Sequence, residues 1–122
     1  RMKYNTGDDV KLVRTADLDG DQRDEILAAS LSHNVYCFGS DGERQWRRDL
    51  GAPVSVLTTV SVDNQVFVIA GATDGTLLTL DANGAVRRSS SIAGTLRDAV
   101  VLDDTTVVLS TAKELIALKA AP

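Results

Sequence analysis

Short apolar runs alternate along this chain with clusters of Gly, Asp, Asn and Ser. The apolar runs are continuous, and we expect them to form strands that are buried on both faces. The segments that follow each pair of runs are instead rich in Arg and Ser, which is typical of a strand at a solvent-exposed rim. No long stretch has apolar residues at helical spacing. The sequence therefore predicts an all-β fold, with buried runs at 26–30, 35–38, 66–72, 77–80 and 106–110 and polar segments at 44–50 and 85–92.

The pattern repeats along the chain. Asp41-Gly42 is followed 42 residues later by Asn83-Gly84, and the run at 35–38 is followed by a second run at 77–80. A third run, at 115–118, comes 38 residues further on. Asn-Gly and Asp-Gly are strong hairpin signals because they accept the positive φ that matches strand twist. Each copy is therefore expected to form an antiparallel unit of up to four strands.

The predicted strands of the three copies follow from these turns. The third copy ends without a fourth strand, whereas residues 1–6 before the first copy resemble a lone fourth strand. The predicted strands are 10–16, 25–30, 34–39 and 44–50, then 54–62, 65–72, 76–82 and 85–92, then 96–102, 105–111 and 114–119.

A period of about 40–45 residues with a buried interior and a polar fourth strand is typical of a β-propeller. We predict a single propeller segment with an orphan outer strand (1–7), blade 1 (10–51), blade 2 (52–94) and an incomplete blade 3 (95–122). A two-sheet sandwich is the second candidate, but it would expose alternate residues on every strand.

Three blades are too few to close a ring, because propellers typically have about 4–8. We therefore expect two chains to form a six-bladed homodimer by strand exchange. The strand around 2–5 of each chain would complete the third blade of the other along 114–119. The alternative is that the chain is a portion of a longer propeller, and a first residue of Arg1 agrees with an excised piece.

Composition excludes several classes of partner. The chain has 122 residues, 43% of them hydrophobic, and a net charge of −4, which disfavours nucleic acid and anionic membranes. No apolar run approaches the length of a membrane span. Cys37 is the only cysteine, which excludes an intrachain disulfide, and we expect it to pack as a small apolar side chain.

An acidic loop, DLDGDQRDE from 17 to 25, lies between the first two predicted strands. Alternate carboxylates in a tight loop can turn inward together, which suits the oxygen-ligand preference of Ca²⁺. The loop is not an EF-hand, because the twelfth position is Ala28 and an apolar strand follows. It resembles the calcium loop of FG-GAP propeller repeats, D-x-[DN]-x-D-G-x-x-[DE].

That resemblance implies a ligand set and one departure from the family pattern. Gln22 stands where the family has Gly, at a position that favours a left-handed backbone, which costs a non-Gly residue roughly 1 kcal/mol. Asp24 would point away from the metal. The alternative is an acidic hairpin loop that stays solvated. The implied ligands are the side chains of Asp17, Asp19, Asp21 and Glu25 and the backbone carbonyl of Arg23.

The segment from 34 to 50, with Trp46 in its polar strand, also resembles PQQ-like propeller repeats, in which a Trp near the end of a blade docks between blades. We expect Trp46 to dock in this way, without a quinone cofactor, and Arg88 holds its place in the second copy. The other Arg residues of the polar strands, at 44, 47, 48 and 87, are expected to keep the rim soluble. His33 is expected in a solvated turn, and no nucleophile can be matched to it.

These features predict a non-enzymatic scaffold or binding module with one structural Ca²⁺ loop and a protein or carbohydrate ligand. One alternative is an accessory propeller portion of a larger secreted polysaccharide-active or quinoprotein-like enzyme. Another is an engineered or reconstructed propeller fragment. The family resemblances favour an extracellular or periplasmic location.

Overall fold

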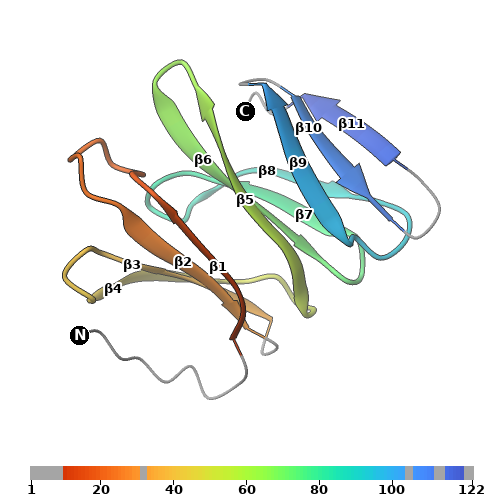
Figure 1. Cartoon of the computed structure of the whole chain (residues 1–122). Coiled ribbons are helices and arrows are strands. Elements are labelled where there is room, and N and C mark those ends of the chain that lie inside the picture. The colour runs from red at the N-terminus through yellow and green to blue at the C-terminus, as the bar shows by residue number, and fades with distance from the viewer. Residues whose placement is uncertain (1–9, 31–32, 104–105, 112–114, 120–122) are drawn as a thin grey trace.

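The computed structural model describes residues 10–30, 33–103, 106–111 and 115–119. These residues form three antiparallel sheets that lie side by side along the chain (Figure 1). In sequence order the strands are β1 (Val10–Ala16), β2 (Glu25–Ser30), β3 (Asn34–Phe38), β4 (Arg44–Asp49), β5 (Val54–Val62), β6 (Gln65–Ala72), β7 (Thr76–Leu80), β8 (Val86–Ser91), β9 (Asp98–Asp103), β10 (Thr106–Ser110) and β11 (Leu115–Lys119).

Each sheet is a simple meander of consecutive strands. Blade 1 is β1-β2-β3-β4, blade 2 is β5-β6-β7-β8, and blade 3 is β9-β10-β11. The inner strands β1, β5 and β9 contact one another from blade to blade, and β2 also contacts β5. The all-β propeller with three repeated blades is therefore confirmed. The predicted strand at 1–6 and its exchange between chains lie outside the described residues.

The core lies between successive blades. Leu27, Val35 and Cys37 of blade 1 are fully buried against Val68 and Leu80 of blade 2. Phe67 and Ile69, which alternate with Val68 along β6, face the other way and pack with Leu109 of blade 3. The middle strands of blade 2 therefore bury both faces, as their continuous apolar runs predicted, because this sheet has a blade on either side. In β10 of blade 3 only alternate residues, Val107 and Leu109, are buried, although the apolar run predicted burial on both faces.

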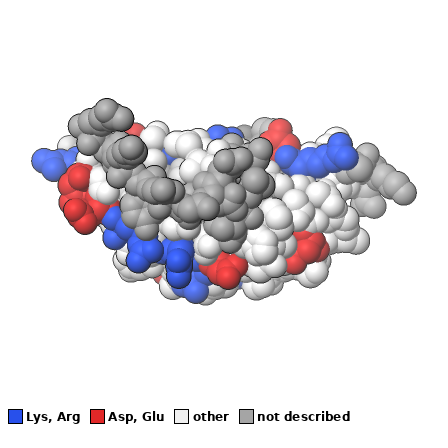
Figure 2. Space-filling model, turned by 90° about the horizontal axis from the view of Figure 1, so that it is seen from below, with Lys and Arg blue, Asp and Glu red and all other residues white. Residues whose placement is uncertain are grey.

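The outer strands are polar, also as predicted. Four of the six residues of β4 and five of the six residues of β8 are exposed. Figure 2 shows one face of the molecule, on which acidic and basic side chains are interspersed rather than gathered by sign.

The third blade differs in detail from the prediction. Its first strand begins at Asp98 instead of 96, because Leu96 is fully buried before the strand starts and packs against Gly71 of blade 2. Arg97 then donates its backbone N–H to the carbonyl of Ser110 at 2.8 Å, which aligns the two strands. No described residue belongs to a helix, so none forms a helix that could cross a membrane.

Candidate metal centre

The acidic loop joins β1 to β2 and is shaped by its own carboxylates. Asp17 accepts the backbone N–H groups of Gly20 at 2.9 Å and of Gln22 at 2.8 Å. Asp21 accepts the N–H of Arg23 at 2.8 Å. Short polar side chains readily satisfy neighbouring backbone donors in this way and thereby stabilise turns. The loop is therefore a defined turn held by side-chain hydrogen bonds.

Two left-handed residues tighten the loop. Gly20 has φ of 79° and Gln22 has φ of 68°. The sequence pattern anticipated a left-handed backbone at Gln22, where the FG-GAP pattern has Gly. A left-handed conformation at a non-Gly residue costs roughly 1–2 kcal/mol, so the rest of the loop holds Gln22 in place against this cost.

Four of the predicted ligands come together in the structure. One oxygen from each of Asp17, Asp19, Asp21 and Glu25 lies within 4.8 Å of the other three. Calcium binds oxygen at about 2.3–2.6 Å, so ligands on opposite sides of one ion lie about 5 Å apart. The cluster therefore fits a single Ca²⁺ in its size and in its donor chemistry.

Glu25 anchors this cluster at the start of β2. Its side chain is buried, and its Oε2 accepts the backbone N–H of Leu18 at 3.0 Å. Asp19 and Asp21 are exposed at the outer side of the loop, and Asp17 is half-buried. The site thus has one fixed carboxylate at its base and three that are more accessible to an arriving ion.

The pKa values of two carboxyls in the cluster, Glu25 and Asp19, are shifted in opposite directions. Burial raises the pKa of Glu25 above its ordinary 4.5, and the neighbouring Asp19 raises it further. The pKa of Asp19 is lowered, chiefly by its hydrogen bond with Glu25. Of these two carboxyls, Glu25 is therefore the one that takes up a proton first as the pH falls. A divalent ion would compete with that proton and offset part of the negative charge of the cluster.

The remaining predicted residues are placed as follows. Asp24 is exposed, and the metal-binding role of the Arg23 carbonyl stays a prediction. His33 is half-buried with φ of 76°, and its carbonyl accepts the N–H of Leu50 at 2.8 Å. Cys37 is buried, and burial raises the pKa of its thiol to about 12, so it packs as an apolar group instead of acting as a nucleophile.

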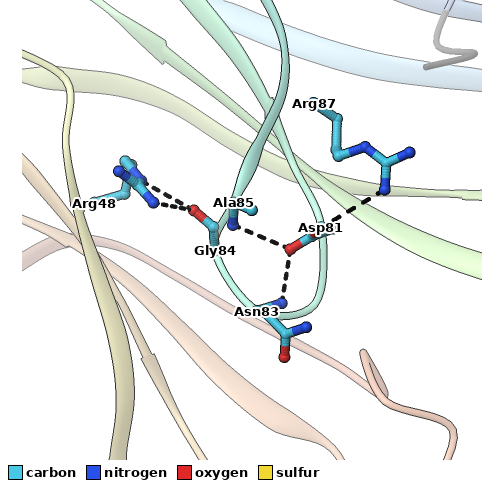
Figure 3. A network of polar contacts seen from close by, with 6 residues as sticks. All are labelled: Arg48, Asp81, Asn83, Gly84, Ala85 and Arg87. Carbon is cyan, nitrogen blue, oxygen red and sulfur yellow. Dashed lines mark hydrogen bonds and ion pairs between the residues drawn. The ribbon is translucent and has the colours of Figure 1, made fainter.

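A polar contact between blades lies close to the loop. Trp46 of β4 donates its indole Nε1–H to the carbonyl of Ala82 in blade 2 at 2.9 Å. Arg48 donates from Nε and Nη2 to the carbonyl of Gly84 at 2.9 and 2.6 Å (Figure 3). Trp46 thus docks between blades as the sequence suggested. Arg48 does not serve only rim solubility as expected, because its half-buried guanidinium holds two blades together.

The turn at 81–85, whose carbonyls accept these hydrogen bonds, is stabilised by its own Asp81. Asp81 Oδ1 accepts the N–H groups of Asn83 at 2.9 Å and Ala85 at 3.0 Å, and its Oδ2 faces Arg87 Nη1 at 3.9 Å (Figure 3). A cleft of about 470 Å³ separates this turn from the acidic loop. The cleft is lined on one side by Asp17 and Asp19 and on the other by Asp81, Asn83 and Arg87.

Comparison with known proteins identifies the family. Residues 7–95 match the model of the lambda-carrageenase beta-propeller domain. The chain belongs to this family. It is 36% identical over 74 residues, 60% of its length, to the lambda-carrageenase of a Pseudoalteromonas species. It is 34% identical over 89 residues, 72% of its length, to that of Pseudoalteromonas carrageenovora.

The chain is identified as a member of the lambda-carrageenase propeller family, and the identification goes no further than the family. The chain spans only 8% and 9% of the two relatives, so it corresponds to a small part of those enzymes. A solved structure of BBS1N in complex with ARL6DN superimposes with a TM-score of 0.76 at 12% identity, covering 94% of this chain and 35% of that one. This likeness shows the fold alone, and the FG-GAP and PQQ-like resemblances stay predictions.

Proposed function

We propose that the chain is part of a non-catalytic propeller module within a secreted polysaccharide-degrading enzyme of the lambda-carrageenase kind, with Ca²⁺ stabilising its first blade. The observation that carries this proposal is the carboxylate cluster of the β1–β2 loop, whose oxygens lie within 4.8 Å of one another. Membership of the lambda-carrageenase propeller family supports the setting in a larger enzyme.

The metal would be structural. Three carboxylates of the loop and the buried Glu25 at the start of β2 would enclose the ion, leaving a hard cation surrounded by protein oxygens. Because Glu25 also binds the N–H of Leu18, an ion held there would tie the end of the loop to the strand behind it. The thiol of Cys37 is buried and its pKa is raised to about 12, so this side chain does not act as a nucleophile.

Calcium is expected to raise the thermal midpoint of unfolding. An ion at 100 times its dissociation constant stabilises the folded state by about 2.7 kcal/mol, which corresponds to about 10 °C for a chain of this length. Asp19→Ala should abolish both the shift and the heat of binding, because it removes one of the four carboxylates. Differential scanning fluorimetry and titration calorimetry measure the two effects.

Asp24→Ala is the matched control, because it removes the same charge from the same loop but lies outside the cluster. This variant should respond to calcium like the unmodified chain. If the unmodified chain shows no response to calcium, or if the response survives in Asp19→Ala, the metal site is contradicted. Either result would leave the family assignment intact.

A homodimeric six-bladed ring is a second candidate for the functional form. The two ends of the stack each carry an exposed large apolar side chain on the outward face. Val13 of β1 is 53% exposed, and Leu115 of β11 is 79% exposed. Large apolar groups left in water at both ends favour burial against a further blade, and two such chains can close one ring.

If the ring forms, light scattering during size exclusion should give about 26 kDa, twice the 13.0 kDa of the chain, because each chain brings half of the ring. Deleting residues 1–6 should shift the mass towards 13.0 kDa, since these residues supply the exchanged strand. A single species of 13.0 kDa at all concentrations rules out the dimer and favours further blades from a longer polypeptide.

A further inference from the structure

The cleft between the acidic loop and the turn at 81–85 lies where blades 1 and 2 differ in their connections. Blade 1 joins β1 to β2 through the loop at 17–24, whereas blade 2 joins β5 to β6 through only Asp63 and Asn64. Residues of the longer loop and of the shorter turn line the same space, which has a volume of about 470 Å³. Ligand pockets in proteins commonly measure about 300–1,000 Å³. The cleft is therefore large enough for a small organic ligand.

Both walls of the cleft are held in place by the protein itself. On the side of blade 1, Asp17 holds the loop by accepting two of its backbone N–H groups. On the side of blade 2, the indole of Trp46 and the guanidinium of Arg48 bind carbonyls of the turn at 81–85. A ligand that enters the cleft therefore meets groups that are already positioned, which lowers the entropic cost of binding.

Three amide side chains line the cleft and are exposed, those of Asn64, Gln65 and Asn83. Within the described part of the chain, no hydrogen bond engages any of these three amide groups. In Figure 3 the side chain of Asn83 extends away from Asp81, and only its backbone N–H takes part in the turn. Each amide offers two N–H donors and a carbonyl acceptor. The cleft thus carries hydrogen-bonding capacity that the described fold does not use.

The carboxylates of the cleft, in contrast, are largely engaged. Both oxygens of Asp17 accept backbone N–H groups, and Oδ1 of Asp81 accepts two more. The lining contains three carboxylates and the guanidinium of Arg87, a formal charge of −2, which a calcium ion in the loop would raise only to zero. In neither state does the cleft have a net positive charge that would attract an anion. Its free polar groups are therefore those that suit a neutral ligand.

Apolar surface completes the lining. Val66 and Ala82 are half-buried at the cleft and pack on the core between blades 1 and 2. A sugar ring has the same two kinds of surface, with C–H groups on its faces and hydroxyl groups at its edge. A hydroxyl group both donates and accepts hydrogen bonds, so it can pair with either end of an amide. The combination of amides and apolar surface therefore matches a saccharide.

We propose that this cleft binds a neutral saccharide, with its hydroxyl groups on the amides of Asn64, Gln65 and Asn83. The C–H face of a ring would lie on Val66 and Ala82. This binding role goes beyond the structural role of calcium, because none of the three amides belongs to the carboxylate cluster. A failure of calcium binding would therefore leave the saccharide site standing.

Nuclear magnetic resonance with two neutral hexasaccharides, one of galactose and one of glucose, tests the proposal. The side-chain amide resonances of Asn64, Gln65 and Asn83 should shift with at least one of them at up to about 10 mM, roughly ten times the Kd of a millimolar complex. The amide of Gln45, which lies outside the cleft, should not shift. The spectra are recorded with calcium and with a chelator, so that a failed metal site is recognised separately. Unchanged resonances of the three amides in both conditions overturn the proposal.

Variants of two of these residues give a second readout. Asn64→Gly and Asn83→Ala should each raise the Kd of the saccharide about fivefold, as expected for one lost hydrogen bond. Glycine is used at Asn64 because the backbone there is left-handed, with φ of 65°. Gln45→Ala removes an amide outside the cleft and should leave the Kd unchanged.

Two charged probes separate the saccharide from other ligands. A sulfated galactose hexasaccharide and a trilysine peptide should shift the three amides less than the neutral hexasaccharide does at the same concentration. A larger shift with either charged probe means that the cleft recognises charge instead of hydroxyl groups, and the proposal is wrong. It is equally wrong if Asn64→Gly and Asn83→Ala bind the neutral saccharide as tightly as Gln45→Ala does.

Discussion

Gly84→Ala is expected to lower the free energy of unfolding by about 3 kcal/mol or more, from backbone strain and from displacement of a docked Trp. The left-handed backbone at Gly84, with φ of 79°, accounts for about 1–2 kcal/mol of this loss. The larger part arises because the new Cβ would lie 2.6–2.9 Å from three atoms of the Trp46 ring. Trp46 would have to move away from the turn at 81–85 and would lose its hydrogen bond to the carbonyl of Ala82. Urea unfolding monitored by circular dichroism measures the loss.

Gly51→Ala separates the two causes. Gly51 has the same φ of 79°, but a Cβ there would meet no atom within 4 Å. This control should therefore show only the backbone strain, about 1–2 kcal/mol. The difference between the two variants measures how much the contact between Trp46 and the turn at 81–85 contributes to the free energy of unfolding. If the two variants are equally destabilised, this contact does not help to hold blades 1 and 2 together.

Gly75→Ala is expected to be at least as damaging, by about 3 kcal/mol or more, since it adds backbone overlap to left-handed strain. Gly75 has φ of 92°, and a Cβ would lie 1.9 Å from the carbonyl oxygen of Ile92. The same two residues share a hydrogen bond, from the N–H of Ile92 to the carbonyl of Gly75 at 2.8 Å. A backbone atom cannot swing aside as a side chain can, so the start of β7 and the end of β8 would have to separate. Urea unfolding provides the measurement.

Gly94 offers the matched control for this second substitution. Its backbone is also left-handed, with φ of 101°, but a Cβ would lie 3.7 Å from Thr111, an ordinary contact distance. Gly94→Ala should lower the free energy of unfolding only by the cost of backbone strain, about 1–2 kcal/mol. A Gly75→Ala protein as stable as Gly94→Ala would show that the β7–β8 pairing near Gly75 is looser than the structure has it.

The repeat made the fold predictable from the sequence. Asp41-Gly42 and Asn83-Gly84, 42 residues apart, fixed the hairpin between the third and fourth strands of two blades, and both hairpins form. The apolar runs predicted the doubly buried strands because burial on both faces removes the alternation of polar and apolar residues. Leu96 was misplaced because apolar character does not distinguish a strand residue from a buried residue in the preceding loop.

The residues of the candidate metal centre were predictable from the sequence, whereas their burial and their interactions are known only from the structure. The spacing of Asp17, Asp19, Asp21 and Glu25 predicted that their oxygens would converge, and they do. The sequence could not show that Glu25 is buried or that its pKa is raised, because both depend on the packing of β2 against its neighbours. The left-handed backbone at Gln22 was inferred from the FG-GAP pattern, and the loop has it.

The role of Arg48 was missed by sequence reasoning. Its charge suggested a solvated rim, and nothing in composition distinguishes it from Arg47, which is exposed. The signal that could have found it is alternation. Residues two apart on a strand share a face, so Arg48 lies on the same face as Trp46, which was expected to dock. The glycine at position 84 completed that pattern, because only a residue without a side chain lets the indole approach the turn.

The central claim is that the carboxylates of the β1–β2 loop hold a structural calcium ion in a stack of propeller blades. A crystal structure of the chain determined with saturating calcium tests it most directly. The account predicts one ion within about 2.6 Å of oxygens from Asp17, Asp19, Asp21 and Glu25. A well-ordered loop with no ion among those four side chains would contradict it.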